Sequence, residues 1–159
     1  IVDLYSSRGV EKHVSYLASY DEISKNNYNL SIENYNYAGL VKMIEDKGKE
    51  TENEISVFQS NHEGVLVDKI QDAYQQFDGI VFNPGAYTHT SIALLDALKA
   101  VMIPCIEVHI SEVSKREAYR QISYIREACF ETVTGLGIKG YKVAIETFVE
   151  RNKKDEVSL

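Results

Sequence analysis

The stretch Gly79-Ile80-Val81-Phe82-Asn83-Pro84-Gly85-Ala86-Tyr87-Thr88-His89-Thr90-Ser91 decides the fold. It begins with an apolar run that is too short for a helix and is bounded by turn residues, a pattern typical of a buried parallel strand. The Asn-Pro-Gly turn at 83–85 ends this strand, because proline has no backbone N–H and glycine adopts conformations that other residues avoid. Side-chain oxygens that could cap the following helix come from Thr88, Thr90 and Ser91.

A strand, a sharp turn and a helix N-terminus in this order often form one side of a binding site. In open α/β sheets, ligands bind at the carboxyl ends of the strands, beside helix N-termini. Asn83 and His89 lie near that turn. The alternative interpretation is an ordinary strand-to-helix loop with a polar cap, and the stretch alone does not separate the two.

Strand and helix patterns alternate along the rest of the chain. Strands are expected at 1–5, 54–60, 79–82, 104–110 and 130–135. Helices with apolar faces are expected at 37–44, 66–74, 92–101 (with Ile92, Leu95, Leu98 and Val101 inward) and 141–148. Residues 10–35 give a poor signal and are expected to form a mobile excursion, and 47–54 to be a solvated connection. This alternation predicts an α/β domain, a three-layer, doubly wound parallel sheet covered by helices on both faces.

Size and composition are those of a globular protein, and they exclude some functions. The 159 residues (18.0 kDa) are 44% hydrophobic and 26% charged, enough for a single domain with its own core. A net charge of −7 argues against a nucleic-acid partner. No apolar run approaches the ~20 residues that span a bilayer, and no signal peptide is evident, so a cytoplasmic location is expected. Cys105 and Cys129 are expected to be buried small hydrophobes, not metal ligands.

Glu107 and His109 are two residues apart on a predicted strand, so their side chains point to the same face. A carboxylate beside an imidazole stabilises the imidazolium form and prepares it to donate a proton near neutral pH. A Glu-x-His pair is more often structural than catalytic, so the pair by itself is weak evidence for an enzyme.

The segment after this strand carries two arginines. Ser114-Lys115-Arg116-Glu117 has the form of a capping box, and the helix it predicts would place Arg116 and Arg120 on one face. Two guanidinium groups suit a carboxylate or a phosphate, although a surface face with ion pairs is the simpler interpretation. The functional hypothesis rests on convergence at one edge of the sheet, where the residues expected are Asn83, His89, Glu107, His109, Ser111 and Arg120.

Three motifs, in this order and at this spacing, resemble those of type II 3-dehydroquinate dehydratases. They are Phe58-Gln59-Ser60-Asn61-His62-Glu63-Gly64, then Asn83-Pro84-Gly85-Ala86-Tyr87-Thr88-His89-Thr90-Ser91, then Ile106-Glu107-Val108-His109-Ile110-Ser111 with Arg116, Glu117 and Arg120. The resemblance runs from about residue 36 to the C-terminal helix.

The resemblance implies a flavodoxin-like fold and a homododecamer built as a tetramer of trimers. It also implies a hydro-lyase that removes water from 3-dehydroquinate to give 3-dehydroshikimate, in the shikimate or quinate pathway. This anti elimination passes through an enolate and uses neither a metal nor a cofactor.

By the same resemblance, His109 matches the general acid that protonates the departing C1 hydroxyl, and Glu107 matches its partner. Asn83, His89 and Arg120 match residues that hold the substrate hydroxyls. The remaining matches are Ile110 and Ser111 around the substrate carboxylate, Arg116 near the lid, and Asp96, an acidic residue that reaches a neighbouring subunit's site.

The first 35 residues depart from the family pattern, which there includes an Asn-Gly-Pro-Asn-Leu-Asn motif and a lid with an arginine and the base tyrosine. Arg8 is the only arginine before Arg116 and therefore the sole candidate for the lid arginine. The base could be Tyr28 or another of the six tyrosines from Tyr5 to Tyr37.

Two functions from different classes follow: a working dehydratase with a divergent lid, or an impaired relative that binds a quinate-like carboxylate or only assembles. A phosphate or nucleotide binder lacks support, because no Gly-rich phosphate loop follows any predicted strand.

Overall fold

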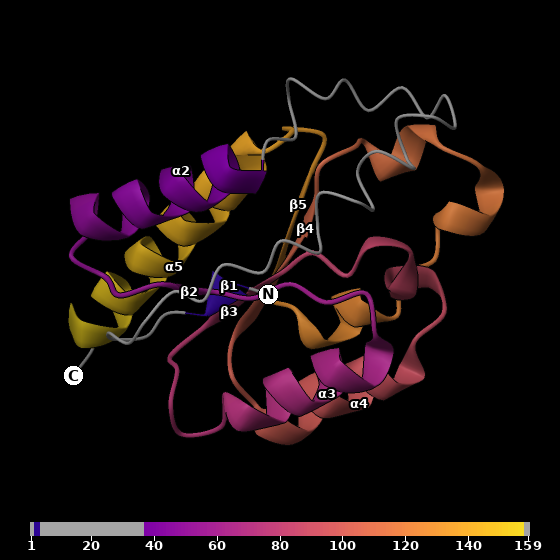
Figure 1. The fold of residues 1–159 in the computed structure, drawn as a ribbon, viewed down its shortest axis with the longest axis horizontal. Helices are drawn as coiled ribbons and strands as arrows, with labels where there is room; N and C mark the ends of the chain where they lie inside the picture. Colours follow the sequence, from indigo (N-terminus) through magenta and orange to yellow (C-terminus); the bar gives the residue numbers. More distant parts are fainter. Residues whose placement is uncertain (1, 4–36, 158–159) are drawn as a thin grey trace.

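The computed structural model describes residues 2–3 and 37–157 (Figure 1). The strands are β1 (Val2–Asp3), β2 (Ser56–Val57), β3 (Ile80–Phe82), β4 (Cys105–His109) and β5 (Glu131–Thr134). The α-helices are α2 (Tyr37–Glu50), α3 (Glu63–Asp72), α4 (Ile92–Val101) and α5 (Lys139–Val157). Short 3-10 segments are η2 (Gly85–His89), η3 (Val113–Lys115), η4 (Ala118–Arg120) and η5 (Ile125–Ala128). The predicted order of strands and helices is confirmed, although β2 is shorter than expected.

The five strands form one sheet in the order β2-β1-β3-β4-β5, which is the flavodoxin-like order. Strands β3, β4 and β5 pair in parallel, as predicted. Strand β1, however, pairs antiparallel with both β2 and β3, so the prediction of an all-parallel sheet is wrong for this strand. Helix-strand alternation determines direction only where a recognisable helix joins neighbouring strands, and the sequence gives no clear helical signal directly after β1.

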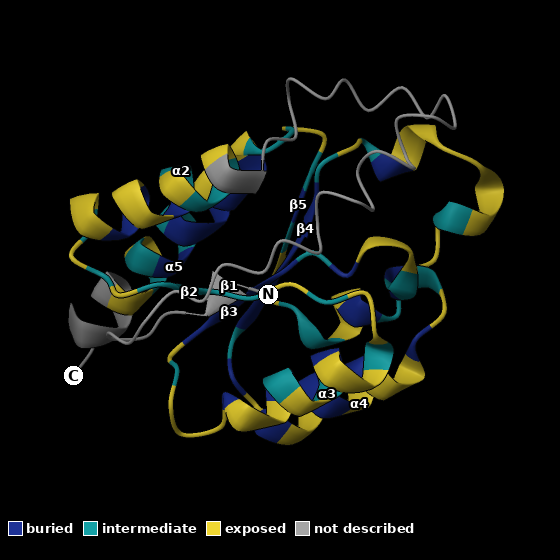
Figure 2. Cartoon of the chain, in the orientation of Figure 1, coloured by how far each residue is buried: buried dark blue, intermediate teal, exposed yellow. Residues whose placement is uncertain are grey.

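Helices cover both faces of the sheet, as predicted. Helices α2 and α5 pack together on one face, and α3 and α4 pack together on the other (Figure 1). Along β3, Ile80 and Phe82 belong to the core under α3 and α4, whereas Val81 belongs to the core under α2 and α5. All three residues are buried, which explains why β3 reads as a continuous apolar run rather than an alternating one. Figure 2 shows the same pattern of buried strands between helices with exposed outer faces.

Gly79, at the start of β3, is needed for close packing. A Cβ atom at this position would lie 2.6 Å from Cε1 of Phe148, a fully buried ring of α5. The helix layer thus approaches the sheet so closely that any larger residue would force the Phe148 ring to shift, and the glycine that precedes the strand is a packing residue as well as a turn signal.

The helix boundaries refine several expectations. Ser91 caps α4, its Oγ accepting a hydrogen bond from the Leu94 backbone N–H at 3.0 Å. Ile92, expected to face inward, is instead 49% exposed, while Leu94 occupies the core beside Leu95 and Leu98. The other residues expected to face inward, Leu95, Leu98 and Val101, are buried, so the predicted face is confirmed and only Ile92, the first residue of α4, is wrong. None of the helices in the described part of the chain is long and apolar enough to cross a membrane.

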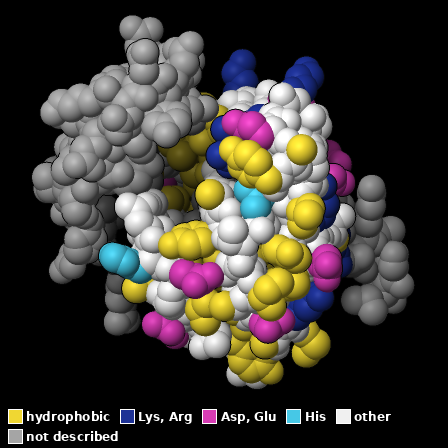
Figure 3. Space-filling model, turned by 90° about the vertical axis from the view of Figure 1, so that its right-hand side faces the viewer, with side chains coloured by type: hydrophobic (Ala, Val, Ile, Leu, Met, Phe, Trp, Pro, Cys, Tyr) yellow, Lys and Arg dark blue, Asp and Glu magenta, His cyan; other side chains and the backbone are white. Residues whose placement is uncertain are grey.

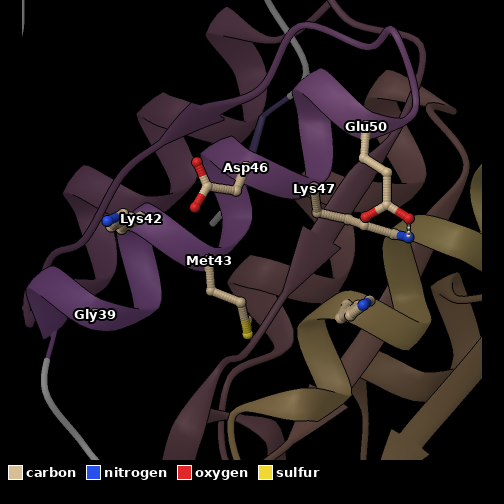
Figure 4. A pocket seen from close by; sticks show the side chains of 7 residues that line it. Gly39, Lys42, Met43, Asp46, Lys47 and Glu50 are labelled. Carbon is tan, nitrogen blue, oxygen red and sulfur yellow. Dashed lines mark hydrogen bonds and ion pairs between the residues drawn. The ribbon is translucent and has the colours of Figure 1, made fainter.

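The expected solvated connection at 47–54 begins inside helix α2. Lys47 is buried, and its ammonium group forms ion pairs with Glu50 at 2.9 Å and with Glu146 of α5 at 2.6 Å. Figure 4 shows Lys47 reaching the Glu50 carboxylate beside a surface hollow of about 330 Å³. A run of charged residues is usually solvated, but the lysine stem packs along apolar surface while its charge meets two carboxylates.

Candidate active site

A cavity of about 470 Å³ opens at the carboxyl ends of β2, β3 and β4. Asn83, which follows β3, and Ile110, which follows β4, both line it. Gln59 and Asn61 contribute polar groups from the segment after β2, and Tyr141 contributes from the start of α5. This is the edge of the sheet where the sequence predicts a ligand, at the topological switch point of the fold.

Two hydrogen bonds fix the side-chain amide of Asn83. Its Oδ1 accepts from the Gly85 backbone N–H at 3.1 Å, and its Nδ2 donates to the Tyr141 hydroxyl at 2.9 Å. Gly85 has φ of +58°, a conformation that glycine adopts readily and that closes this turn. The structure therefore adds Tyr141, whose role sequence analysis missed. The sequence pattern that could have indicated this role is a tyrosine on the inner face of a predicted helix, since a buried hydroxyl needs a hydrogen-bond partner.

Glu107 and His109 pair within β4, as their two-residue spacing predicts. His109 Nε2 donates to Glu107 Oε1 at 2.8 Å. The Glu107 side chain is fully buried, and His109 is 6% exposed. Cys105 lies on the same side of β4, in the core under α3 and α4, so the pair continues the face of the sheet that packs on those helices.

Four further side chains of the described chain bind the Glu107 carboxylate. Thr88 and Ser123 donate hydroxyl hydrogen bonds to Oε1, the latter at 2.7 Å. Oε2 accepts from Arg126 Nε and from the Thr132 hydroxyl, each at 3.4 Å. Thr88, expected to be a possible helix cap, is instead a buried partner of Glu107, because η2 intervenes between β3 and α4.

Glu107 is ionised despite its burial. Burial raises the pKa of this carboxyl, but the hydrogen bonds from His109, Thr88 and Ser123 together with the charge of His109 outweigh that effect and lower the pKa to about 2. A buried carboxylate is stable only when such donors replace its hydration shell. The site thus contains a fixed negative charge directly beside an imidazole.

The segment that carries His89 is joined to residues 122–124. His89 Nδ1 donates to the Ile122 carbonyl oxygen at 2.6 Å, and the Tyr124 backbone N–H donates to the Thr88 carbonyl oxygen at 2.9 Å. These bonds hold His89 half-buried at the end of η2. Neighbouring residues of this short segment therefore contact different partners: His89 bonds to a backbone carbonyl, and Thr88 bonds to Glu107.

The backbone after β4 is fixed by the loop between β5 and α5. The Gly135 and Gly137 backbone N–H groups donate to the carbonyl oxygens of His109 and Ile110, at 3.2 and 3.0 Å. Glu112 then accepts hydrogen bonds from Ser114 and Thr134, which lower the pKa of its carboxyl. Ser111, which lies between Ile110 and Glu112 in the chain, is exposed.

The capping-box helix predicted at Ser114 is not formed. The chain makes the separate 3-10 segments η3 and η4 there, and Ser114 lies inside η3, bonded to Glu112, instead of capping a helix. Arg116 and Arg120 therefore do not share a helix face, but both contact Glu117, at 3.5 and 3.0 Å. The chain is extended at Arg116 and Glu117, the residues that would form the first turn of the predicted helix.

The remaining predicted residues lie apart from the cavity or beyond the described residues. Asp96 is exposed on α4. Among the predicted residues, those lining the cavity in the described chain are Asn83 and Ile110, with His109 directly before Ile110. Arg8 and Tyr28, the candidates for the base half, fall outside the residues that the structure describes.

An ionised carboxylate that orients an imidazole can support a proton transfer at the neighbouring cavity. Together with the strand order, this arrangement defines a flavodoxin-like α/β protein with a buried carboxylate–imidazole pair beside its switch point.

Comparison with known proteins gives the family. The family model described as Dehydroquinase class II matches residues 10–149. This chain belongs to the class II dehydroquinases.

Curated relatives and solved structures agree with this assignment. The chain is 53% identical over 117 residues to a 3-dehydroquinate dehydratase of Lachnospira eligens, covering 72% of this chain and 80% of that one. It is 53% identical over 105 residues to a catabolic 3-dehydroquinase of Aspergillus clavatus, covering 66% and 69%. The crystal structure of a type II dehydroquinase from Butyrivibrio crossotus superposes with a TM-score of 0.70 at 50% identity, covering 72% and 80%.

Proposed function

We propose that this chain removes water from 3-dehydroquinate to give 3-dehydroshikimate, as a cofactor-independent hydro-lyase of the shikimate or quinate pathway. The observation that carries the proposal is the buried pair of Glu107 and His109, 2.8 Å apart at the carboxyl end of β4, in a chain about half identical to proteins named 3-dehydroquinate dehydratase. These relatives do not favour the alternative of an impaired binding protein.

His109 is the general acid in this proposal. It gives its proton to the C1 hydroxyl that leaves as water, and the adjacent Glu107 carboxylate stabilises the imidazolium until the transfer. The Glu107 contact occupies Nε2, so Nδ1 is the ring nitrogen assigned to the proton transfer. The pKa of about 2 keeps Glu107 charged across the physiological pH range, so its support for His109 is constant there.

Substrate binding is assigned to Asn83 and Ile110, which line the cavity, and to His89, Ser111 and Arg120, which lie outside its lining. Asn83, held by Tyr141, binds substrate hydroxyls together with His89 and Arg120. The backbone amides and side chain at Ile110 and Ser111 hold the carboxylate. The two glycine N–H groups that fix the carbonyls of His109 and Ile110 support this role, because they orient the peptide bonds that follow.

The base half is assigned to the first 35 residues, the divergent first-strand and lid part of a single domain of residues 1–159. Tyr28, or another of the six tyrosines from Tyr5 to Tyr37, is the candidate base, and Arg8 is the candidate for the cation that activates it. A tyrosine has an unperturbed pKa of about 10, so removal of the C2 proton near neutral pH requires a nearby positive charge. Arg116, exposed in the segment after η3, would lie near the lid.

A homododecamer in the cytoplasm, built as a tetramer of trimers, is the assembly we propose. Large apolar side chains are exposed on the described surface, among them Ile92, Tyr119 and Ile122, at 49%, 65% and 57%. Figure 3 shows hydrophobic side chains interspersed with charged ones on the side where the segments after β4 lie. Asp96, exposed on α4, would reach the site of a neighbouring subunit in such an assembly.

The test is the increase in ultraviolet absorbance as purified chain converts 3-dehydroquinate to the conjugated enone. His109→Ala should lower kcat by about 10²-fold or more and change KM little, because a general acid acts mainly on the transition state. His62→Ala is the matched control, since His62 is exposed and makes no capping hydrogen bond at α3.

Solvent exchange separates the enzyme from the impaired relative. A working base exchanges the C2 proton of dehydroquinate with deuterated solvent, even in His109→Ala, whereas a pure binding protein does not. Wild-type chain that binds dehydroquinate with neither exchange nor turnover would refute the proposed function. Turnover that survives His109→Ala would refute the assignment of the acid.

A further inference from the structure

We propose that Thr88 and Ser123 are positioning residues for the acid: their hydroxyl groups form a clamp that holds the Glu107 carboxylate charged and turned toward His109. The inference rests on the proposed function, and it assigns roles to two residues that do not face the cavity.

The clamp acts on the same oxygen atom that binds the acid. Both hydroxyls and His109 Nε2 converge on Glu107 Oε1, while Arg126 and Thr132 bind Oε2 at the longer distance of 3.4 Å. With Oε1 held from two sides, rotation of the carboxylate away from His109 would break two hydroxyl hydrogen bonds. Hydrogen bonds to a charged, buried group are stronger than those between neutral groups, so losing two of them would be costly and the carboxylate keeps this orientation.

Burial gives the two hydroxyls weight in keeping Glu107 charged. The Glu107 and Thr88 side chains are both fully buried, and an ionised carboxylate without donors in such a place takes up a proton. A protonated Glu107 would no longer stabilise an imidazolium at His109. Together with His109, Arg126 and Thr132, the two hydroxyls therefore favour the charged carboxylate that the acid depends on.

The backbone directs the proton of Ser123. The Arg126 backbone N–H donates to Ser123 Oγ at 3.1 Å. The hydroxyl oxygen is therefore the acceptor in that bond, and the hydroxyl proton remains available to the Glu107 carboxylate. Thr88 Oγ1 lies 2.7 Å from Ser123 Oγ, so the two hydroxyls can donate to Glu107 separately or in series. In either arrangement, each hydroxyl proton lies within the cluster around Oε1.

The clamp also joins the acid to the binding segment. Thr88 directly precedes His89 in η2, and residues 122–124 bond to both, through the Ile122 carbonyl and the Tyr124 backbone N–H. A shift of η2 or of residues 122–124 would therefore displace the hydroxyl groups that bind Glu107. This arrangement couples the placement of the substrate-binding histidine to the orientation of the acid's partner.

The experiment compares Thr88→Val and Ser123→Ala with wild-type chain in the absorbance assay across pH. Each variant should lower kcat about tenfold and leave KM within about twofold, because the hydroxyls do not touch substrate. The acidic limb of the kcat profile should move toward neutral pH by about one unit, the equivalent of one hydrogen bond to a charged group.

Other ionisable groups near Glu107 remain in every variant. They are His109 and Cys105 on β4, His89 at the end of η2, Arg126 and Glu127 on η5, Cys129 after it, and Glu131 on β5. A limb shift that both variants share therefore reports the lost hydroxyls and not a changed set of charges.

Conservative and control variants make the result specific. Thr88→Ser and Ser123→Thr keep a hydroxyl at each position and should have the wild-type pH profile. Thr147→Val removes a hydroxyl that donates to the Val143 carbonyl on α5, far along the chain from Glu107, and should change neither kcat nor the profile. Ser123 is only half-buried, so Ser123→Ala keeps the test available if Thr88→Val fails to fold.

A fall in kcat with the limb shift and with rescue by the conservative variants supports the clamp. An unshifted limb in folded Ser123→Ala or Thr88→Val overturns it, as does a loss that appears only in KM. Absence of turnover in the wild-type chain would instead count against the proposed function, so the two failures are distinguishable.

Discussion

Asn83 Nδ2 donates a hydrogen bond of 2.9 Å to the hydroxyl of Tyr141, 58 residues further along the chain. This contact ties the carboxyl end of β3 to the first turns of α5 across the mouth of the cavity that both residues line. The Asn83 amide is therefore oriented by α5 as well as by its own turn.

Tyr141→Phe should weaken substrate binding by freeing the Asn83 amide. The loss of one neutral hydrogen bond is worth about 1 kcal/mol, so KM should rise about fivefold while kcat changes less. Steady-state kinetics measure this, with Tyr74→Phe as a control because Tyr74, just after the C-cap of α3, is 52% exposed. An unchanged KM would show that the turn at Gly85 suffices to orient Asn83.

The charge on Glu107 should make stability depend on acid pH. Its folded-state pKa of about 2 lies below the ordinary 4.5, so its contribution to stability is fully present above about pH 4.5 and is lost as pH falls toward 2. Each unit of pKa difference is worth about 1.4 kcal/mol, which makes the contribution about 3 kcal/mol. Urea unfolding at a series of pH values measures it.

Glu107→Gln should flatten this dependence relative to the wild-type chain. Glu131→Gln, a change of an exposed glutamate on the adjacent strand, should leave it intact. Other carboxyls with lowered pKa values, such as those of Glu112 and Glu117, contribute equally to both curves, so the difference between the curves isolates Glu107. Parallel curves for wild type and Glu107→Gln would contradict the prediction.

Gly79→Ala should destabilise the fold by about 1–3 kcal/mol, the cost typical of overpacking. The added Cβ would lie 2.6 Å from the Phe148 ring, which is enclosed by the core. The matched control is Gly64→Ala in α3, where a Cβ meets nothing within 4 Å. That change should stabilise the protein by about 0.5–1 kcal/mol, because alanine favours helix. Thermal unfolding of the two variants should therefore shift in opposite directions.

Lys47→Ala should lower the melting temperature without altering kcat. The variant loses the buried lysine stem and both ion pairs, including the one that joins α2 to α5. Lys47→Met keeps an apolar stem and should be less harmful. Lys42→Ala, on the exposed side of the same helix, should leave the melting temperature nearly unchanged. A wild-type melting temperature for Lys47→Ala would show that the ion pairs add nothing.

Several features followed from local sequence patterns. The apolar run 80–82, the turn after it and the helix at 92–101 are recognisable because backbone preferences and hydrophobic periodicity act over a few residues. The pairing of Glu107 with His109 follows from the two-residue period of a strand. The Ser91 cap likewise needs only the adjacent turn.

Other features depended on contacts between distant segments. The direction of β1 was not readable, since pairing across a sheet is not encoded within a two-residue strand. The segment after β4 forms 3-10 turns in place of the predicted helix, and there Glu112 accepts hydrogen bonds from Ser114 and from Thr134 of β5, a contact that a capping motif does not reveal. Lys47 was buried by α5, which lies a hundred residues away in the chain.

The sequence by itself determined the order of strands and helices, the placement of a polar site at the carboxyl edge, and the Glu107–His109 pair, because each depends on short-range periodicity. Tertiary structure alone decided which groups surround that pair. Thr88, Ser123, Arg126 and Thr132 come from three separate segments, and nothing in their local sequence distinguishes them from ordinary surface polar residues. Packing of η2, η5 and β5 around a buried carboxylate brings them together, since a charge removed from water must find its donors wherever the chain passes.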